Sequence, residues 1–328
     1  MKNRRDFLVL LGAGALSSAR LVFAQPRMAR VGWMMTQAYS PYGEMTARGF
    51  IKGLAEHGYV EGKNLVLERR SSEGDIKRFP AMARELVQAG VDVIFAPAKP
   101  MADAAWYASR EIPTVIATVT DPVTVQYAKS LARPGLHITG VTTANAELIG
   151  KRLELLKDLL PGIKRVAVLL DDDALRSCRE EMNQVDAASR HLGLTIIRVS
   201  ASRREELDAA FARAASMKAQ ALMTVPMTTN HDIAHLVADL GAKQRLPVIH
   251  DVSNVTENGG LISYGPDFED IFRRAGHYVA RILKGEKPAG MAIEEPRQFV
   301  FSVNLGVAKK LGITVPPAIM VRANKVIE

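Results

Sequence analysis

The sequence predicts an α/β protein built as two doubly wound lobes with parallel sheets, and three observations lead to this fold class. Short apolar runs alternate with longer amphipathic segments along most of the chain, which is typical of doubly wound α/β proteins. Several of the runs are almost wholly apolar, as strands buried on both faces of a parallel sheet must be. The same order of elements occurs twice, which indicates two similar lobes rather than one large sheet.

The expected strands follow the chain in two sets. Between two strands of the first set, Phe79, Met82 and Leu86 fall at helical spacing with charged residues on the opposite face, which predicts an amphipathic helix. We expect the first set over 30–35, 65–70, 91–96 and 114–117, and the second set over 165–170, 195–199, 221–225 and 248–250.

The spacing within the two sets supports the repeat. The first two strands begin 35 residues apart in one set (positions 30 and 65) and 30 residues apart in the other (165 and 195). Pro113 and Pro247 precede the last strand of each set, at a strand start where proline is tolerated. A glycine-containing join at 134–141 and two later extended runs at 260–265 and 297–303 have no counterpart in the repeat. We expect these three segments to cross between the lobes as a hinge of parallel strands.

The first residues have the layout of an export signal. Arg4 and Arg5 precede Phe7, Leu8 and an uncharged run that ends at position 19. A small-residue cleavage pattern then ends at Ala24. Paired arginines before such a run resemble the bacterial twin-arginine signal, which addresses a protein for export. The sequence therefore predicts a signal peptide over 1–24, cleavage after Ala24 and a mature protein in the periplasm.

Charge and cysteine content narrow the class of protein further. The formal charge of +8 falls to about +5 in the mature chain, because residues 1–24 carry four basic residues and one acidic residue, a net +3. The remaining basic residues are spread along the chain without the cluster that a nucleic-acid face needs. Cys178 is the only cysteine, so no intrachain disulfide can form. We expect a monomer that binds no nucleic acid and does not insert into the membrane.

Candidate ligand contacts lie where the expected strands end. In open parallel sheets a ligand sits beyond the carboxyl ends of the strands, and with two facing lobes these ends line a shared cleft. The loops there carry hydroxyls, one lysine and a few carboxylates, a set that suits a small zwitterion. Lys99 or a helix N-terminus would face a carboxylate, and an aspartate would face an ammonium group. The candidate contacts are Thr36, Ser40, Lys99, Thr120, Asp121 and Asp251.

Signatures of enzymes, cofactors and metals are weak. The Gly12-Ala-Gly14 start of a dinucleotide motif lies inside the signal with no strand before it, and no P-loop or nucleophile elbow is present. His231 and His235 have metal-ligand spacing, but no third ligand is evident, and we expect a solvated helix face there. The acidic run 171–173 is interpreted as turn chemistry. The sequence therefore predicts a binding protein with no cofactor and no catalytic residues.

Motifs spread over nearly all of the mature chain resemble one family. The chain is similar to substrate-binding proteins of ABC transporters, in particular the tryptophan-transporter-like group. The resemblance rests on Gly49-Phe-x-x-Gly53-Leu54, on Asp121-Pro122-Val123, on Gly259 to Pro266, and on the runs 54–64, 68–75, 130–135, 139–141, 151–156, 282–288 and 311–317.

This resemblance implies a type I periplasmic-binding fold in which three chain crossings form the hinge. It implies an N-terminal lobe over 29–141 plus 264–297 and a C-terminal lobe over 142–263 plus 298–328. It also implies delivery of a small organic solute, an amino acid or related carboxylate, to an ABC permease and its ATPase in the inner membrane. The loop 96–99 carries Ala-Pro-Ala-Lys in place of the usual Gly-Gly-Thr, so the ligand of relatives does not transfer directly.

The sequence leaves two alternative functions open, a sensor and an enzyme, and it excludes a third, a repressor. The same bilobal module could present its ligand to a membrane kinase or chemoreceptor. An enzyme on this fold would need a catalytic pair in the cleft. A sugar-type repressor would need an N-terminal helix-turn-helix where the signal stands, and the sequence excludes it.

Overall fold

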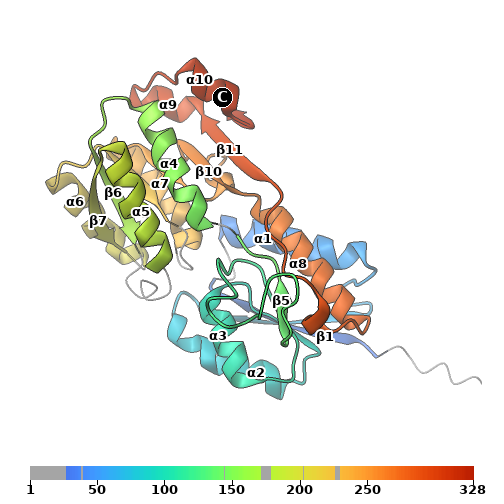
Figure 1. Ribbon diagram of the computed structural model, residues 1–328. Coiled ribbons are helices and arrows are strands. Elements are labelled where there is room, and N and C mark those ends of the chain that lie inside the picture. The colour runs from blue at the N-terminus through green and yellow to red at the C-terminus, as the bar shows by residue number, and fades with distance from the viewer. Residues whose placement is uncertain (1–26, 38–39, 144, 171–178, 202, 226–229) are drawn as a thin grey trace, which may run out of the picture.

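The computed structural model places the chain in two lobes, each built around one sheet (Figure 1). The structure describes residues 27–37, 40–143, 145–170, 179–201, 203–225 and 230–328. The expected signal segment 1–24, Cys178 and the acidic run 171–173 lie outside the described residues. Within the described residues, no helix combines the length and the apolar character needed to cross a bilayer.

The first sheet has the strand order β2-β1-β3-β4-β5, and all of its pairs are parallel. Its central strands are buried on both faces, which explains their apolar sequences. The strands are β1 (Ala29–Met35), β2 (Leu65–Ser71), β3 (Val93–Phe95), β4 (Thr114–Ile116) and β5 (Ile138–Gly140). The helices of this lobe are α1 (Pro41–Glu56), α2 (Phe79–Gln88), α3 (Lys99–Ala108) and α8 (Phe268–Leu283).

The second sheet has the order β12-β11-β10-β9-β8-β6-β7. Its strands are β6 (Arg165–Leu170), β7 (Thr195–Ser200), β8 (Ala221–Thr224), β9 (Val248–His250), β10 (Ile262–Pro266), β11 (Phe299–Asn304) and β12 (Lys325–Ile327). The helices of this lobe are α4 (Asn145–Leu159), α5 (Arg179–Leu192), α6 (Leu207–Ser216), α7 (Asn230–Lys243), α9 (Leu305–Leu311) and α10 (Pro317–Arg322).

The chain passes between the lobes three times. It leaves the first lobe after β5, returns from β10 to α8, and crosses back to β11 (Figure 1). Strand β10 stays paired in the second sheet through Pro266. The expectation of parallel hinge strands is wrong for β10 and β11, which pair antiparallel. The cause is topological: the chain leaves along β10, turns around through α8 and returns along β11.

The predicted fold class is confirmed, and each of the eight expected strands is present within two residues of its expected bounds. The join at 134–141, expected as a hinge strand, contains strand β5, which pairs parallel with β4 and completes the edge of the first sheet.

Glycines let α1 and α8 approach closely within the first lobe. A Cβ added at Gly53 would lie 1.9 Å from the carbonyl oxygen of Arg273, and one at Gly276 would lie 2.5 Å from that of Phe50. Both distances are far below any real Cβ contact, so only glycine fits at these positions. Since Ser40 caps α1 and Phe268 is the first residue of α8, this packing fixes these two residues relative to each other.

Candidate functional site

A polar contact between the lobes forms where the N-termini of α1 and α7 meet. Ser40 caps α1: its Oγ accepts a hydrogen bond from the backbone N–H of Gly43 at 2.9 Å. The same hydroxyl donates to Oδ1 of Asp232 at 2.6 Å, although the two residues are 192 positions apart. Both side chains are buried, with Ser40 4% exposed and Asp232 5% exposed. We call Thr36, Ser40, Tyr42, His231 and Asp232 the interlobe cluster.

Asp232 is a buried carboxylate with hydroxyl partners. Burial raises the pKa of Asp232 to about 6, although hydrogen bonds from Ser40 and Thr36 and the charge of His231 oppose this shift. Among the described residues, no lysine or arginine forms an ion pair with Asp232. Its place in the first turn of α7 favours a negative charge by about 0.3–1 kcal/mol. That is less than the several kcal/mol that burial of an ion costs.

Asp251, at the end of β9, is buried close to Asp232 but has a different set of partners. Its Oδ1 accepts a hydrogen bond from the hydroxyl of Thr224 at 2.9 Å, and its Oδ2 lies 2.6 Å from Nε2 of His231. Burial alone would raise the pKa of Asp251, but His231, the guanidinium of Arg152 and the Thr224 hydroxyl together hold it well below its usual range. Asp251 therefore stays ionised, and its negative charge is balanced by partners within the second lobe.

Arg152 links this arrangement to the hinge. Its Nε donates a hydrogen bond at 2.7 Å to the carbonyl oxygen of Tyr264, which lies in the crossing strand β10. Because the Arg152 side chain is fully buried, its charge must be balanced within the protein. The electrostatic attraction to Asp251 supplies that balance.

Aromatic rings surround His231 and belong to the other lobe. The ring of Tyr42 in α1 lies 4.8 Å from the ring of His231, and that of Phe268 in α8 lies 5.1 Å from it. Tyr42 and Phe268 also meet edge to face at 5.5 Å. Burial, with the charges of Asp232 and Asp251, raises the pKa of Tyr42 well above its ordinary value. The N-terminus of α7 thus packs against two aromatic residues of the first lobe.

A second contact between the lobes involves Thr120, which follows β4. Its hydroxyl donates to Oε1 of Glu181 in α5 at 3.1 Å, and Glu181 is buried. The carboxyl ends of strands in the first sheet therefore reach two helices of the second lobe, α5 and α7.

The other two predicted contacts in the first lobe have partners within that lobe. Lys99 begins α3 and pairs with Asp103 one turn later, with Nζ and Oδ2 2.8 Å apart. The carboxylate of Asp121 accepts hydrogen bonds from the backbone N–H groups of Val123 and Thr124. Burial raises the pKa of Asp121, but the hydrogen bonds outweigh this and lower it overall.

The structure therefore brings together three of the six predicted ligand contacts: Thr36 and Ser40 around Asp232, and Asp251 against the adjacent His231. Thr120, Lys99 and Asp121 lie at other positions near the strand ends, and the role of all six as ligand contacts stays a prediction. The parts of the strand-end loops at 38–39, 171–178 and 226–229 lie outside the described residues.

The expectation of a solvated face for the start of α7 is wrong. His231 is 7% exposed and Asp232 is 5% exposed, because this end of α7 lies against α1 of the first lobe. Sequence reasoning noticed the two histidines but did not select Asp232. The only available signal was an acidic residue in a first helical turn beyond a buried strand, and that pattern is common at helix starts.

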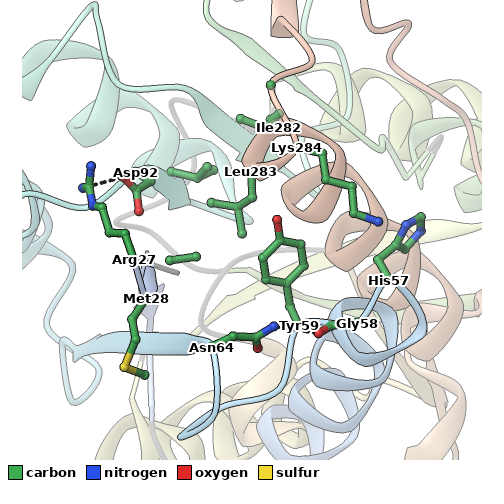
Figure 2. Close-up of a pocket in the computed structure, with 13 residues that line it drawn as sticks. Arg27, Met28, His57, Gly58, Tyr59, Asn64, Asp92, Ile282, Leu283 and Lys284 are labelled. Carbon is green, nitrogen blue, oxygen red and sulfur yellow. Dashed lines mark hydrogen bonds and ion pairs between the residues drawn. The ribbon is translucent and has the colours of Figure 1, made fainter. Parts of the chain in front are cut away.

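A groove at the far end of the first lobe is separate from the interlobe cluster. Figure 2 shows this groove, of about 620 Å³, between the start of β1 and the C-terminal ends of α1 and α8. Tyr59 stands in it, with His57 and Lys284 on one side and the ion pair of Arg27 with Asp92 on the other. None of the predicted ligand contacts lines it.

Two α/β sheets joined by three crossings define a type I periplasmic-binding fold, and solved structures share it. The family model for ABC transporter substrate binding proteins matches residues 41–327. The chain therefore belongs to this family, as the sequence motifs predicted.

Three similar proteins show how close the resemblance is in sequence and in structure. A tyrosine-binding protein from Clostridioides difficile is 25% identical over 273 residues, which cover 83% of this chain and 77% of the relative. The structure of an ABC domain from Streptococcus pneumonia in complex with L-Trp is 26% identical, with a TM-score of 0.82 over 92% of this chain and 100% of that one. A conserved domain protein from Vibrio cholerae O1 biovar eltor is also 26% identical, with a TM-score of 0.84 over the same shares.

Proposed function

We propose that this protein is the solute-binding component of an ABC importer and that it captures an amino acid or related carboxylate between its two lobes. Relatives that bind tyrosine and L-Trp support this ligand class. One observation carries the proposal: buried polar side chains from both lobes meet at the ends of their strands, as Ser40 and Asp232 do. A solute held there contacts both lobes at once.

The mechanism follows from this geometry. A ligand that contacts both lobes binds the closed arrangement more tightly than the open one, so it shifts the balance towards closure. The hinge strands β10 and β11 are held to the second lobe, whereas α8 is packed on the first lobe. Closure is then a rigid-body rotation about the crossings, and a permease distinguishes the two states by the closed surface.

We propose the lobe limits given by the resemblance, 29–141 plus 264–297 and 142–263 plus 298–328. The arrangement of the sheets supports them, apart from the last residues of β10, which remain paired in the second sheet.

The carboxylate of the ligand has two candidate partners near the end of β3. Lys99 is the first residue of α3, and the N-cap residue of this helix is Ala98, whose side chain has no group that could cap it. Uncapped N–H groups at a helix start and an adjacent ammonium group both favour a carboxylate.

We further propose that residues 1–24 direct export and are removed, that the mature protein works in the periplasm as a monomer, and that it delivers its ligand to a permease and ATPase. Family membership and the layout of the N-terminus support this location. The protein acts by binding and release, without a chemical step.

Thermal-shift screening of the mature protein tests the proposal. With L-Trp, L-Tyr, other amino acids, organic acids and sugars as probes, a ligand at 100 times its dissociation constant stabilises the folded state by about 2.7 kcal/mol. We expect such a shift from at least one amino acid or carboxylate. A shift with sugars and none with amino acids or organic acids would overturn the ligand class.

A further inference from the structure

Two neighbouring carboxylates differ in how their charge is balanced. Asp251 and Asp232 are both buried, and His231, which directly precedes Asp232 in the sequence, contacts Asp251. Asp251 contacts His231, accepts a hydrogen bond from the hydroxyl of Thr224 and is attracted to the charge of Arg152. Among the described residues, the hydrogen-bond donors to Asp232 are the hydroxyls of Ser40 and Thr36. In the same part of the chain, the basic side chain that acts on Asp232 is that of His231, and its Nε2 already contacts Asp251.

Hydroxyl donors do not complete the environment of an ionised carboxylate. A carboxylate has about four acceptor positions, so two hydroxyls leave about half of them unused. Hydroxyls also bring no positive charge, and buried charges in proteins are as a rule paired. The raised pKa of Asp232 is the consequence: without a cation, the buried group holds a proton more tightly.

The position of Asp232 indicates which kind of group could balance its negative charge. Its oxygen Oδ1 accepts a hydrogen bond from Ser40 across the boundary between the lobes, and Thr36 directly follows β1 in the same lobe as Ser40. This is the place where the proposed function puts a solute. Asp251, by contrast, makes its hydrogen bonds within the second lobe.

We propose that Asp232 binds a cationic amino group of the solute, with the hydroxyls of Thr36 and Ser40 beside it, and thereby selects amino acids over the same carboxylates without an amino group. The inference rests on the proposed function and adds a specificity-determining residue to it. An amino group in this position contacts both lobes, so it contributes to closure as well as to affinity.

Matched ligand pairs test the inference. Isothermal titration calorimetry compares L-Trp with indole-3-propionate and L-Tyr with 3-(4-hydroxyphenyl)propionate, because each pair differs only by the amino group. Wild-type protein should prefer the amino acid by about 10- to 100-fold, the range for a hydrogen bond to a charged group. In Asp232→Asn the affinity for the amino acid should fall by a similar factor, whereas that for the deaminated partner should stay the same or rise.

Asp239→Asn is the matched control, because Asp239 lies on the same helix and is exposed. It should leave both affinities unchanged, and circular dichroism melting should show both variants folded. If Asp232→Asn weakens both members of a pair equally, Asp232 holds the lobes together and does not read the amino group, and the inference is overturned. It is also overturned if the variant keeps the wild-type preference.

A separate outcome identifies failure of the proposed function. If wild-type and Asp239→Asn proteins bind neither member of any pair while a sugar binds, the ligand class is wrong and the inference fails with it. If the deaminated partners bind wild-type protein as tightly as the amino acids, the ligand class stands and only the role of Asp232 fails.

Proton linkage gives a second measurement. Titration in two buffers of different ionisation enthalpy reports the protons taken up on binding. Closure around a deaminated ligand should draw a proton to Asp232, whereas closure around an amino acid should not. The titratable groups that face Asp232 are Tyr42 and His231, with Asp251 beyond them. Proton uptake that persists unchanged in Asp232→Asn would assign the linkage to one of these neighbours and contradict the inference.

Discussion

Helix α1 takes part in two interfaces that are built in opposite ways. Along its length it packs against α8, where Gly53 and Gly276 let backbone meet backbone. At its N-terminus it meets α7 of the other lobe through side-chain hydrogen bonds such as that from Ser40 to Asp232. Hydrogen bonds of the second kind exchange readily for bonds to a ligand or to water. The backbone packing has no substitute, so α1 and α8 must move together when the lobes open.

The largest expected effect comes from breaking the glycine interface. Gly53→Ala places a methyl group against the carbonyl of Arg273, a backbone atom that cannot rotate away. We expect the free energy of unfolding to fall by about 3 kcal/mol, measured by thermal and denaturant melting. Gly162→Ala is the control, since a Cβ there has no neighbour within 4 Å. Equal stability of the two variants would contradict the rigid packing.

The next effect concerns the pH dependence of the polar interface. The folded protein keeps a proton on Asp232 up to about pH 6, whereas an ordinary aspartate with a pKa of 3.8 has released it. The folded state therefore binds more protons between these values, and the contribution of Asp232 to stability falls as pH rises through this window. The difference in free energy of unfolding between wild type and Asp232→Asn should decrease by about 2 kcal/mol in total from pH 4 to pH 6.

Melting curves at several pH values check this, with Asp239→Asn again as the control on the same helix. A wild-type-minus-variant difference that does not change from pH 4 to pH 6 would show that Asp232 stays ionised throughout.

A smaller effect separates the capping role of Ser40 from its role between the lobes. Ser40→Ala should lower the free energy of unfolding by about 1 kcal/mol, as loss of an N-cap does. Asp267→Ala removes the cap of α8, where Asp267 accepts a hydrogen bond from the N–H of Asp270 within the same lobe, and should cost a similar amount. Only Ser40→Ala should increase the radius of gyration in small-angle scattering. The same increase in both variants would remove Ser40 from the interlobe contact.

The smallest effect on stability is expected at Lys99. Its ion pair with Asp103 is partly exposed, so Lys99→Ala should change the free energy of unfolding by less than about 0.5 kcal/mol. The affinity for a carboxylate ligand should nevertheless fall, as calorimetry would show. Lys151→Ala, which removes a similar ion pair with Glu154, should leave that affinity unchanged. An equal affinity for both variants would exclude Lys99 from the site.

The sequence was sufficient for most of the fold because parallel strands need continuous apolar runs. The runs at 93–95 and 221–224 are buried on both faces, and such runs are visible in a sequence. Strand β5 was predicted as part of the hinge and not of the first sheet, because it has three residues, one of them glycine, and lies at a crossing. The antiparallel pairing of β10 with β11 was missed because direction depends on where the chain turns around, which in this protein is α8.

The site was less predictable than the fold. Thr36 and Ser40 could be selected because polar residues at strand ends face a shared boundary in this fold class. Asp232 could not, since its contact with Ser40 joins residues 192 positions apart and only the packing of α7 on α1 buries it. The helical spacing of His231 and His235 led to the prediction of a solvent-exposed helix face. That prediction failed because spacing alone does not show whether another lobe covers the helix.

The packing of α1 on α8 also sets the order in which the protein is completed during synthesis. The ion pair of Arg48 with Glu269 joins residues 221 positions apart, and the glycine contact lies beside it. The ribosome makes most of the second lobe before it makes α8, and only β11, α9, α10 and β12 of that lobe follow. Until then, the face of α1 that carries Gly53 has no partner, so the first lobe waits for a segment near the end of the chain. Domains near the N-terminus usually fold first during synthesis. In this protein the N-terminal lobe cannot finish folding until α8 has been made.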